Sequence, residues 1–187
     1  MILIIDTSSS LVAIATGDGT RSEMFLPARS PDLLPGLRRV ARSARITKIA
    51  VATGPGSFTG LRVGVSFGLG LAMGLRVPIV PLPSLDLQAA RSTVPVTAVI
   101  DAGRGRYYYK LPDEEPRLGE PAAIPATHAL VGNVADPMSL VAAGHSFKLE
   151  RDLRPFVEAA EIFLETAAEV PYRSLEVEYM QTFTAKK

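Results

Sequence analysis

Two aspartates, Asp6 and Asp101, each stand where a short apolar run ends in a turn of small residues. Turns of this kind can hold nucleotide phosphates and Mg²⁺, a chemistry that favours glycine because the backbone must approach the phosphate. The first turn, residues 6–9, has no glycine, and the second, residues 101–105, has two with Arg104 between them. An aspartate that closes a turn is the simpler interpretation of each, and catalysis is the alternative.

The stretch Gly54-Pro55-Gly56-Ser57 is a second candidate for phosphate chemistry, because it precedes a long apolar segment that can form a helix. The glycines allow a tight turn, the proline stiffens it, and Ser57 can cap the helix. A phosphate loop needs a lysine, which this turn lacks, and a dinucleotide loop needs one residue fewer before Gly60. We interpret Gly54, Pro55, Gly56 and Ser57 as a structural turn, with a nucleotide loop as the alternative.

The segment after this turn reads as a helix with a glycine-rich side. On a helical wheel its five glycines share one side, and Leu61 and Val65 lie on the other. Because the segment is apolar all round, we expect the leucine side to pack on the chain's own sheet and the glycine side to meet a second helix or a subunit. Tight packing of the glycines inside their own domain is the alternative. The predicted partner or dimer interface consists of Gly60, Gly64, Phe67, Gly68 and Leu71.

The overall composition excludes several classes of protein. The 187 residues allow one domain or two small ones, and 20 Lys and Arg balance 19 Asp and Glu, which argues against bulk attraction to nucleic acid. Cysteine is absent, and the two histidines, His128 and His145, are not spaced as metal ligands, so we expect no disulfide and no metal site. The N-terminus lacks a signal-peptide pattern, and the apolar run 63–75 is shorter than the roughly 20 residues of a membrane span. We expect a soluble cytoplasmic protein.

The apolar periodicity predicts an α/β fold with two lobes. Residues 1–94 read as β-β-β-α-β-α-β-α, which implies a mixed sheet with packed helices. The pattern restarts in residues 95–187. Each of the two halves of the chain opens with a strand that ends in aspartate. The second lobe looks smaller and has a poorly defined tail from residue 172. Its predicted elements are strands at 96–100, 106–111, within 117–124 and at 139–143, and a helix at 156–169.

Four segments of the sequence resemble the TsaB (YeaZ) family of bacterial tRNA threonylcarbamoyladenosine biosynthesis proteins. They are Ile5-Asp6-Thr7-Ser8, Leu33-Leu34-Pro35, the stretch from Gly54 to Gly64, and Ile100-Asp101-Ala102. The resemblance covers roughly residues 1–111 and implies the two-lobed fold of actin, Hsp70 and sugar kinases (the ASKHA fold), with a mixed sheet and packed helices in each lobe. The segment before Leu33 departs from the family, which often has a His-Ser/Thr pair there.

The same resemblance implies a subunit without a catalytic residue of its own. Family members are regarded as paralogues of TsaD, which transfers threonylcarbamoyl to adenosine in tRNA, and this chain lacks the His-x-x-x-His metal motif of TsaD. Asp6 and Asp101 would then be degenerate nucleotide-site positions. The implied partners are TsaD, the ATPase TsaE through the complex, and a second copy in a homodimer, with tRNA contacted only indirectly and no membrane. The chain alone would bind no cofactor, and ATP or ADP would bind at the interface of the complex.

A small ATP-dependent enzyme of the kinase-like fold is the alternative function. Asp6 would then be a metal ligand or a general base. A third class, a stand-alone protease, has no nucleophile–base pair or metal motif here to support it.

Overall fold

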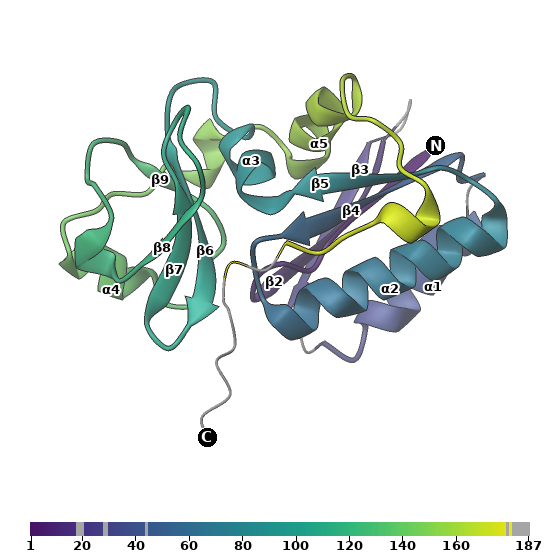
Figure 1. The fold of residues 1–187 in the computed structure, drawn as a ribbon, viewed down its shortest axis with the longest axis horizontal. Coiled ribbons are helices and arrows are strands. Elements are labelled where there is room, and N and C mark those ends of the chain that lie inside the picture. Colours follow the sequence, from purple (N-terminus) through teal and green to yellow (C-terminus); the bar gives the residue numbers. More distant parts are fainter. Residues whose placement is uncertain (18–20, 28–29, 44, 179, 181–187) are drawn as a thin grey trace.

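The computed structural model describes residues 1–17, 21–27, 30–43, 45–178 and 180, and it contains two sheets (Figure 1). The first sheet has the strand order β3-β2-β1-β4-β5, and the second has the order β8-β7-β6-β9. The strands of the first sheet are β1 (Ile2–Asp6), β2 (Leu11–Gly17), β3 (Ser22–Pro27), β4 (Lys48–Gly54) and β5 (Ile79–Pro83). Those of the second are β6 (Thr97–Gly103), β7 (Arg106–Lys110), β8 (Arg117–Gly119) and β9 (Leu130–Val131).

Both sheets are mixed, as the sequence predicts. In the first sheet β1, β2 and β3 form an antiparallel meander, whereas β4 runs parallel to β1 and β5 runs parallel to β4. In the second sheet β7 is antiparallel to its neighbours β6 and β8, and β9 runs parallel to β6. Strands β1 and β4 are continuous apolar runs because helices cover the first sheet on both faces.

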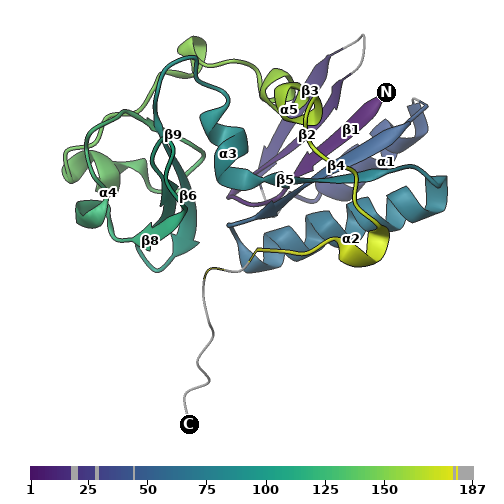
Figure 2. The ribbon, with the colours of Figure 1, turned by 45° about the horizontal axis from the view of Figure 1, so that its top comes forward.

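Helices α1 and α2 lie on one face of the first sheet, and α3 and α5 lie on the other (Figures 1 and 2). Alternation along β1 explains this division, since Leu3 and Ile5 join the core under α1 and α2 whereas Ile4 joins the core under α5. The α-helices of the chain's described part are α1 (Leu33–Ser43), α2 (Phe58–Leu75), α3 (Ser84–Ala89), α4 (Pro137–Ala142) and α5 (Phe156–Leu164). Short 3₁₀ turns occupy Pro121–Ala123, Glu150–Asp152 and Tyr172–Ser174.

The assignment of all residues after 94 to the second lobe is wrong for α5 and for the segment that follows it. Phe156 and Val157 of α5 pack on the first sheet, and Val170 forms an antiparallel bridge with Ile79 at the free edge of β5. The second lobe is therefore smaller still, because it consists of the second sheet, α4 and their connections. An amphipathic pattern shows that a helix has a buried face, but it does not show which sheet covers that face.

The segment predicted as a strand at 139–143 is instead part of helix α4. Asp136 caps this helix, because its carboxylate accepts hydrogen bonds from the backbone N–H groups of Met138 and Ser139. Pro137 occupies the first helical position, where its missing N–H costs nothing. This local start signal overrides the short apolar run that follows it.

The tail predicted from residue 172 docks on the first lobe. The Tyr172 hydroxyl donates hydrogen bonds to the carbonyls of Ala72 and Val77, at 3.3 and 2.8 Å, beside the end of α2. Further along, the backbone N–H of Glu178 donates to the Thr53 carbonyl at 2.8 Å. Residues 179 and 181–187 of the tail lie outside the described residues.

Helix α2 packs on the sheet in a different orientation from the predicted one. Its buried residues are Leu61, Gly64, Val65, Gly68 and Ala72. A Cβ atom on Gly60 or Gly64 would overlap Thr7, and one on Gly68 would overlap Val51. The expectation that these three glycines face a partner is wrong, because they let the helix backbone approach the chain's own sheet.

The remaining α2 positions follow from this orientation. Phe67 and Leu71 are half-buried and pack against the same core, so a partner contact for them stays a prediction. Met73, which the helical wheel places on the same side as Leu61 and Val65, is 55% exposed. By length and composition alone α2 could cross a membrane, but a core helix of a globular protein passes the same test, and α2 rests one side on the first sheet.

Candidate functional site

The two turns that could carry phosphate chemistry pack against each other. The backbone N–H of Ser57 donates a hydrogen bond to the Ser8 carbonyl at 2.7 Å, and a Cβ atom on Gly56 would overlap Ser8. The Thr7 hydroxyl donates to the Gly60 carbonyl at 2.7 Å, inside the first turn of α2. The glycine-rich turn thus seals the β1–β2 turn, and Ser57 also caps the helix by accepting from the Gly60 N–H.

Asp6 is enclosed by this arrangement. It is 2% exposed, and its Oδ1 accepts a hydrogen bond from the Ser8 N–H at 2.8 Å. Burial raises the pKa of the Asp6 carboxyl, and hydrogen bonding from Ser8 opposes that shift only in part. A carboxyl in such a place closes a turn and is not accessible to a substrate or a solvated Mg²⁺.

Asp101 plays a similar structural part in the second lobe. Its Oδ2 accepts a hydrogen bond from the Ala135 N–H at 2.6 Å, which ties the end of β6 to the loop before α4. Burial raises the pKa of the Asp101 carboxyl, the bond from Ala135 lowers it, and the neighbouring Asp136 raises it. Asp6 and Asp101 lie in separate lobes, and neither lines the cleft between them.

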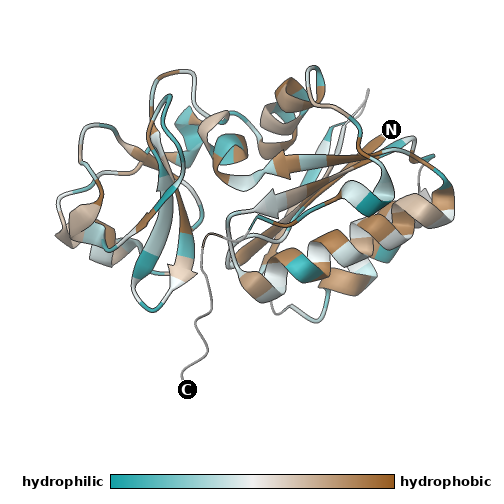
Figure 3. Ribbon diagram, viewed as in Figure 1, coloured by the Kyte–Doolittle hydropathy of each residue, from teal (hydrophilic) through white to brown (hydrophobic). Residues whose placement is uncertain are grey.

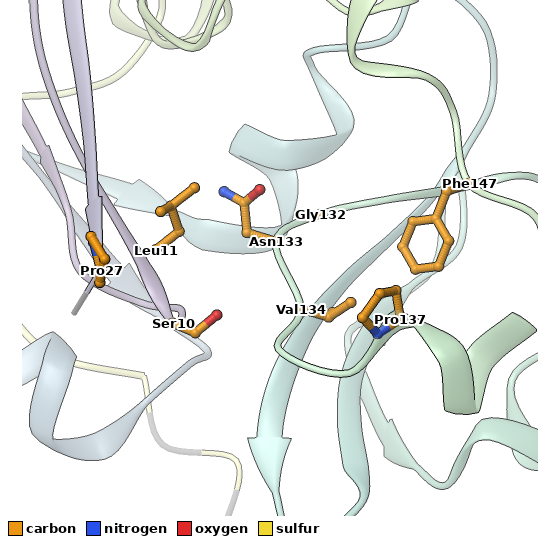
Figure 4. A pocket seen from close by; sticks show the side chains of 8 residues that line it. All are labelled: Ser10, Leu11, Pro27, Gly132, Asn133, Val134, Pro137 and Phe147. Atoms are coloured by element: carbon orange, nitrogen blue, oxygen red, sulfur yellow. The ribbon is translucent and has the colours of Figure 1, made fainter. Parts of the chain in front are cut away.

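A cleft of about 420 Å³ lies between the two lobes (Figure 4). It is lined from the first lobe by Ser10, Leu11 and Pro27, and from the second by Gly132, Asn133, Val134, Pro137 and Phe147. None of these residues is ionisable. Within the described ranges there is also no cluster of three His, Asp or Glu side chains that could hold a metal ion. Sequence reasoning missed this lining because its residues belong to no motif.

The two histidines do not meet. His145 is buried in the second lobe, where its Nε2 lies 3.0 Å from the Pro121 carbonyl oxygen. His128 is paired locally, with its Nδ1 3.0 Å from the Thr127 hydroxyl. Their separate surroundings give no shared site.

The outward side of α2 is the second candidate site. Its exposed residues include Val63, Ser66, Gly70, Met73 and Gly74, which we call the outer α2 face. Arg62 is also exposed, at the start of the helix, where its guanidinium lies 3.7 Å from the centre of the Phe58 ring. Val63 is 42% exposed, and no heavy atom lies within 4 Å of a Cβ built on Gly70 or Gly74. Leu34 of α1, on the same side of the sheet, is also exposed. Figure 3 shows that the visible side of α2 is mostly apolar. An apolar helix side with small residues is a surface that another helix can approach closely.

Comparison with known proteins assigns the family. Residues 39–150 match the model of the family described as TsaD: tRNA N6-adenosine threonylcarbamoyltransferase. The chain is 29% identical over 143 residues to the tRNA threonylcarbamoyladenosine biosynthesis protein TsaB of Bacillus subtilis, covering 72% of this chain and 62% of that protein. It is 30% identical over 122 residues to the Escherichia coli protein of the same name, covering 58% of this chain and 53% of that protein. It thus spans little more than half the length of these relatives.

A solved structure shows the same fold. The protein described as YeaZ from Pseudomonas aeruginosa superposes with a TM-score of 0.72 at 22% identity, over 95% of this chain and 99% of the other. At this identity the likeness supports the two-lobed α/β architecture, including the reduced second lobe. The family model, which matches more than half of the chain, shows that this chain belongs to the TsaD family, and the curated relatives to which it is similar are TsaB proteins.

Proposed function

We propose that this chain is a non-catalytic, soluble cytoplasmic subunit that binds a TsaD protein for the formation of N6-threonylcarbamoyladenosine in tRNA. The observation that carries the proposal is the contrast between a sealed β1–β2 turn and an open outer α2 face. The first removes Asp6 from any substrate, and the second offers a surface to a protein. The TsaB relatives support a place in tRNA threonylcarbamoyladenosine biosynthesis, and the family resemblance implies TsaD as the partner.

The absence of catalysis is supported by the chemistry of the cleft. Phosphoryl transfer needs cations or Mg²⁺ to neutralise the charge that develops on phosphate oxygens. The cleft lining that the structure describes offers Ser10 and Asn133 as polar side chains and no charged one. On this proposal, ATP or ADP binds at the interface of the complex, TsaE is a partner through the complex, and tRNA contacts this chain only indirectly.

The partner surface is supported by the shape of α2. Because Gly64 and Gly68 bring the helix close to the sheet, the opposite side forms a low surface of small residues. Val63 and Met73 stand at its borders and supply apolar area that water would otherwise cover. On this proposal a second copy of the chain binds the same face, so the chain forms a homodimer in the absence of TsaD.

Exchanging an exposed methionine tests the location of the interface. We expect Met73→Arg to weaken binding to TsaD from the same organism by about tenfold or more, since it places a charge in an apolar contact. Met138→Arg is the matched control, because Met138 is 68% exposed on α4 of the second lobe. Both variants would be co-expressed with TsaD and analysed by gel filtration and calorimetry, with and without ATP. Equal binding by Met73→Arg and the wild type would refute this interface, and failure of the wild type to bind TsaD would refute the proposed function.

Calorimetry with ATP and Mg²⁺ tests the enzyme alternative. We expect no heat of binding from the isolated chain, because Asp6 is sealed and the cleft lining is uncharged. Tight binding that disappears in Asp6→Ala would instead favour an ATP-dependent enzyme.

A further inference from the structure

The segment that follows α5 returns along the first lobe and reaches the second (Figure 1). We call its described residues, 170–178 and 180, the strap. Leu175 and Val177 are half-buried and pack on the core of the first lobe, whereas the glutamate after each of them is exposed. This alternation is typical of an extended segment that lays one face on the protein. The strap is therefore docked on the first lobe by its own side chains.

Hydrogen bonds fix the strap to the first lobe at three points. The Val170 N–H donates to the Ile79 carbonyl at 3.0 Å, at the edge of β5. The Tyr172 hydroxyl donates to two carbonyls beside the end of α2. The Glu178 N–H donates to the Thr53 carbonyl at 2.8 Å, near the end of β4. The strap thus runs from the edge of the first sheet to the turn before α2.

The glycine-rich turn leaves room for the last part of the strap. A Cβ atom on Gly54 would lie 2.7 Å from the Glu178 carbonyl oxygen, closer than a side chain can approach. The φ angle of Gly54 is +119°, which residues with a side chain rarely adopt. The strap therefore packs directly on the backbone at the point where β4 ends.

The last described residue of the strap lies where the two lobes meet. Met180 packs on a buried cluster to which α3 contributes Leu85 and the second sheet contributes Ala98, Ile100 and Tyr108. Helix α3 itself covers the first sheet (Figure 1). Because the strap is hydrogen-bonded to β4 and also contacts this cluster, it connects the lobes without belonging to either sheet.

Two linkers join the lobes on the opposite side of their interface from the strap (Figures 1 and 2). Residues 90–96 lead from α3 to β6, and residues 150–155 lead back to α5. The Arg154 N–H donates to the Arg91 carbonyl at 2.7 Å, and each of the two arginine side chains donates to a carbonyl of the other linker. Because the linkers are tied side by side, they form a single hinge.

We propose that the strap is a latch, which holds the two lobes at one angle while it is docked and lets the second lobe turn about the hinge when it is released. The apolar side chains of the strap are only half-buried, whereas Arg91 of the hinge and Leu85 of the cluster are buried. Segments with few buried contacts open at a lower free energy than the core, so the strap should open first. Turning of the second lobe would change the width of the cleft between Leu11 and Asn133. This inference does not depend on the proposed function, since it concerns the chain alone.

Spin labels on the two lobes test the latch. The sequence contains no cysteine, so Ser22→Cys on β3 and Ala126→Cys in the turn before β9, both at exposed positions, would carry the labels for pulsed electron paramagnetic resonance. We expect one narrow distance distribution from the full chain, and a distribution about twofold broader or more when the chain ends after Glu169. The matched control ends after Met180, keeps the whole strap and should resemble the full chain. An unchanged distribution in the chain that ends after Glu169 would overturn the latch.

A point variant decides the question if the shortened chain fails to fold. We expect Met180→Asp to broaden the distance distribution, because it places a charge against the apolar cluster between the lobes. Met138→Asp is its matched control, because Met138 is 68% exposed on α4 and should tolerate the charge. Circular dichroism would confirm that both variants fold. A folded Met180→Asp variant with the distribution of the full chain would refute the proposal.

Hydrogen exchange tests whether the strap opens by itself. In the full chain we expect the Val170 and Glu178 amides to exchange about 100-fold faster than the amides of β1 and β4, because the strap can open while the sheet stays folded. Nuclear magnetic resonance would follow the individual amides. Equal exchange rates in the strap and the sheet would show that the strap opens only when the lobe unfolds, which contradicts a latch.

Discussion

The inner and outer sides of α2 carry the same residue type in opposite surroundings. Gly64 and Gly68 lie on the inner side, where a Cβ atom would overlap Thr7 or Val51 of the sheet. Gly70 and Gly74 lie on the outer side, where nothing of the described chain comes within 4 Å of a built Cβ. The inner glycines are required by packing within the chain, whereas the outer glycines have no such requirement. Each interior glycine costs a helix about 1 kcal/mol relative to alanine, so the outer pair needs a different explanation, which a partner would supply.

The largest expected effect comes from filling the inner side. We expect Gly64→Leu or Gly68→Leu to lower the free energy of unfolding by about 3 kcal/mol, because a side chain there forces the helix away from the sheet. Urea unfolding monitored by circular dichroism would measure the change. The matched control is Gly70→Leu, which we expect to unfold within about 0.5 kcal/mol of the wild type or at higher urea. Equal stability of all three variants would remove the distinction between the two sides.

The sequence predicts helix α2 but not which of its sides faces the sheet. Ser57, the glycine turn before it and the apolar length mark the helix, and the continuous apolar run of β1 marks a buried strand beneath it. After its first turn only two polar side chains, Arg62 and Ser66, mark the exposed side of α2, and the apolar pattern alone placed the buried arc about 60° from where the sheet meets it. The role of Gly64 and Gly68 is clear only from the structure, in which Thr7 and Val51 lie against them.

Local sequence patterns predict some other parts of the fold and not others. The order of strands and helices in the first lobe is confirmed, because short connections join neighbouring elements. The position of α5 on the first sheet depends on a chain that crosses between the lobes twice, and no local pattern encodes that path. Asp136 and Pro137 do form a helix-start signal before α4, which the apolar run after them obscured. The cleft residues Ser10 and Asn133 come together from separate lobes and carry no shared motif.

Filling the outer side should affect binding in place of folding. We expect Gly70→Leu to weaken TsaD binding by about tenfold, since a large side chain would hold a partner helix away from the α2 backbone. Calorimetry with purified TsaD would measure this, on samples whose urea midpoint matches that of the wild type. Unchanged affinity in a folded Gly70→Leu variant would show that the partner does not cover this part of α2.

Replacing single glycines by alanine tests the same contrast between the inner and outer sides of α2. We expect Gly70→Ala to raise the free energy of unfolding by about 0.5–1 kcal/mol, because alanine is the better helix former and has open space there. Gly68→Ala should lower it, because even a methyl group meets Val51. Urea midpoints of the two variants, moving in opposite directions, would confirm that the helix has one tight side and one open side.

The smallest effect concerns Asp6, which lies beneath the turn that packs on the inner side of α2. Because burial raises the pKa of its carboxyl above the value in the unfolded chain, the folded state binds more protons in the window between about pH 4 and the raised pKa. The contribution of Asp6 to stability therefore falls as the pH rises through that window, and the ionised carboxyl is a cost above it. Asp6→Asn removes the charge and keeps an oxygen that can accept the Ser8 N–H. We expect the urea midpoint of this variant, relative to the wild type, to increase from pH 4 to pH 7. If Asp6 instead bound a cation as an ionised ligand, the substitution would lower stability most at pH 7 when Mg²⁺ is present. The same titration with and without Mg²⁺ therefore distinguishes a buried structural aspartate from a cation ligand.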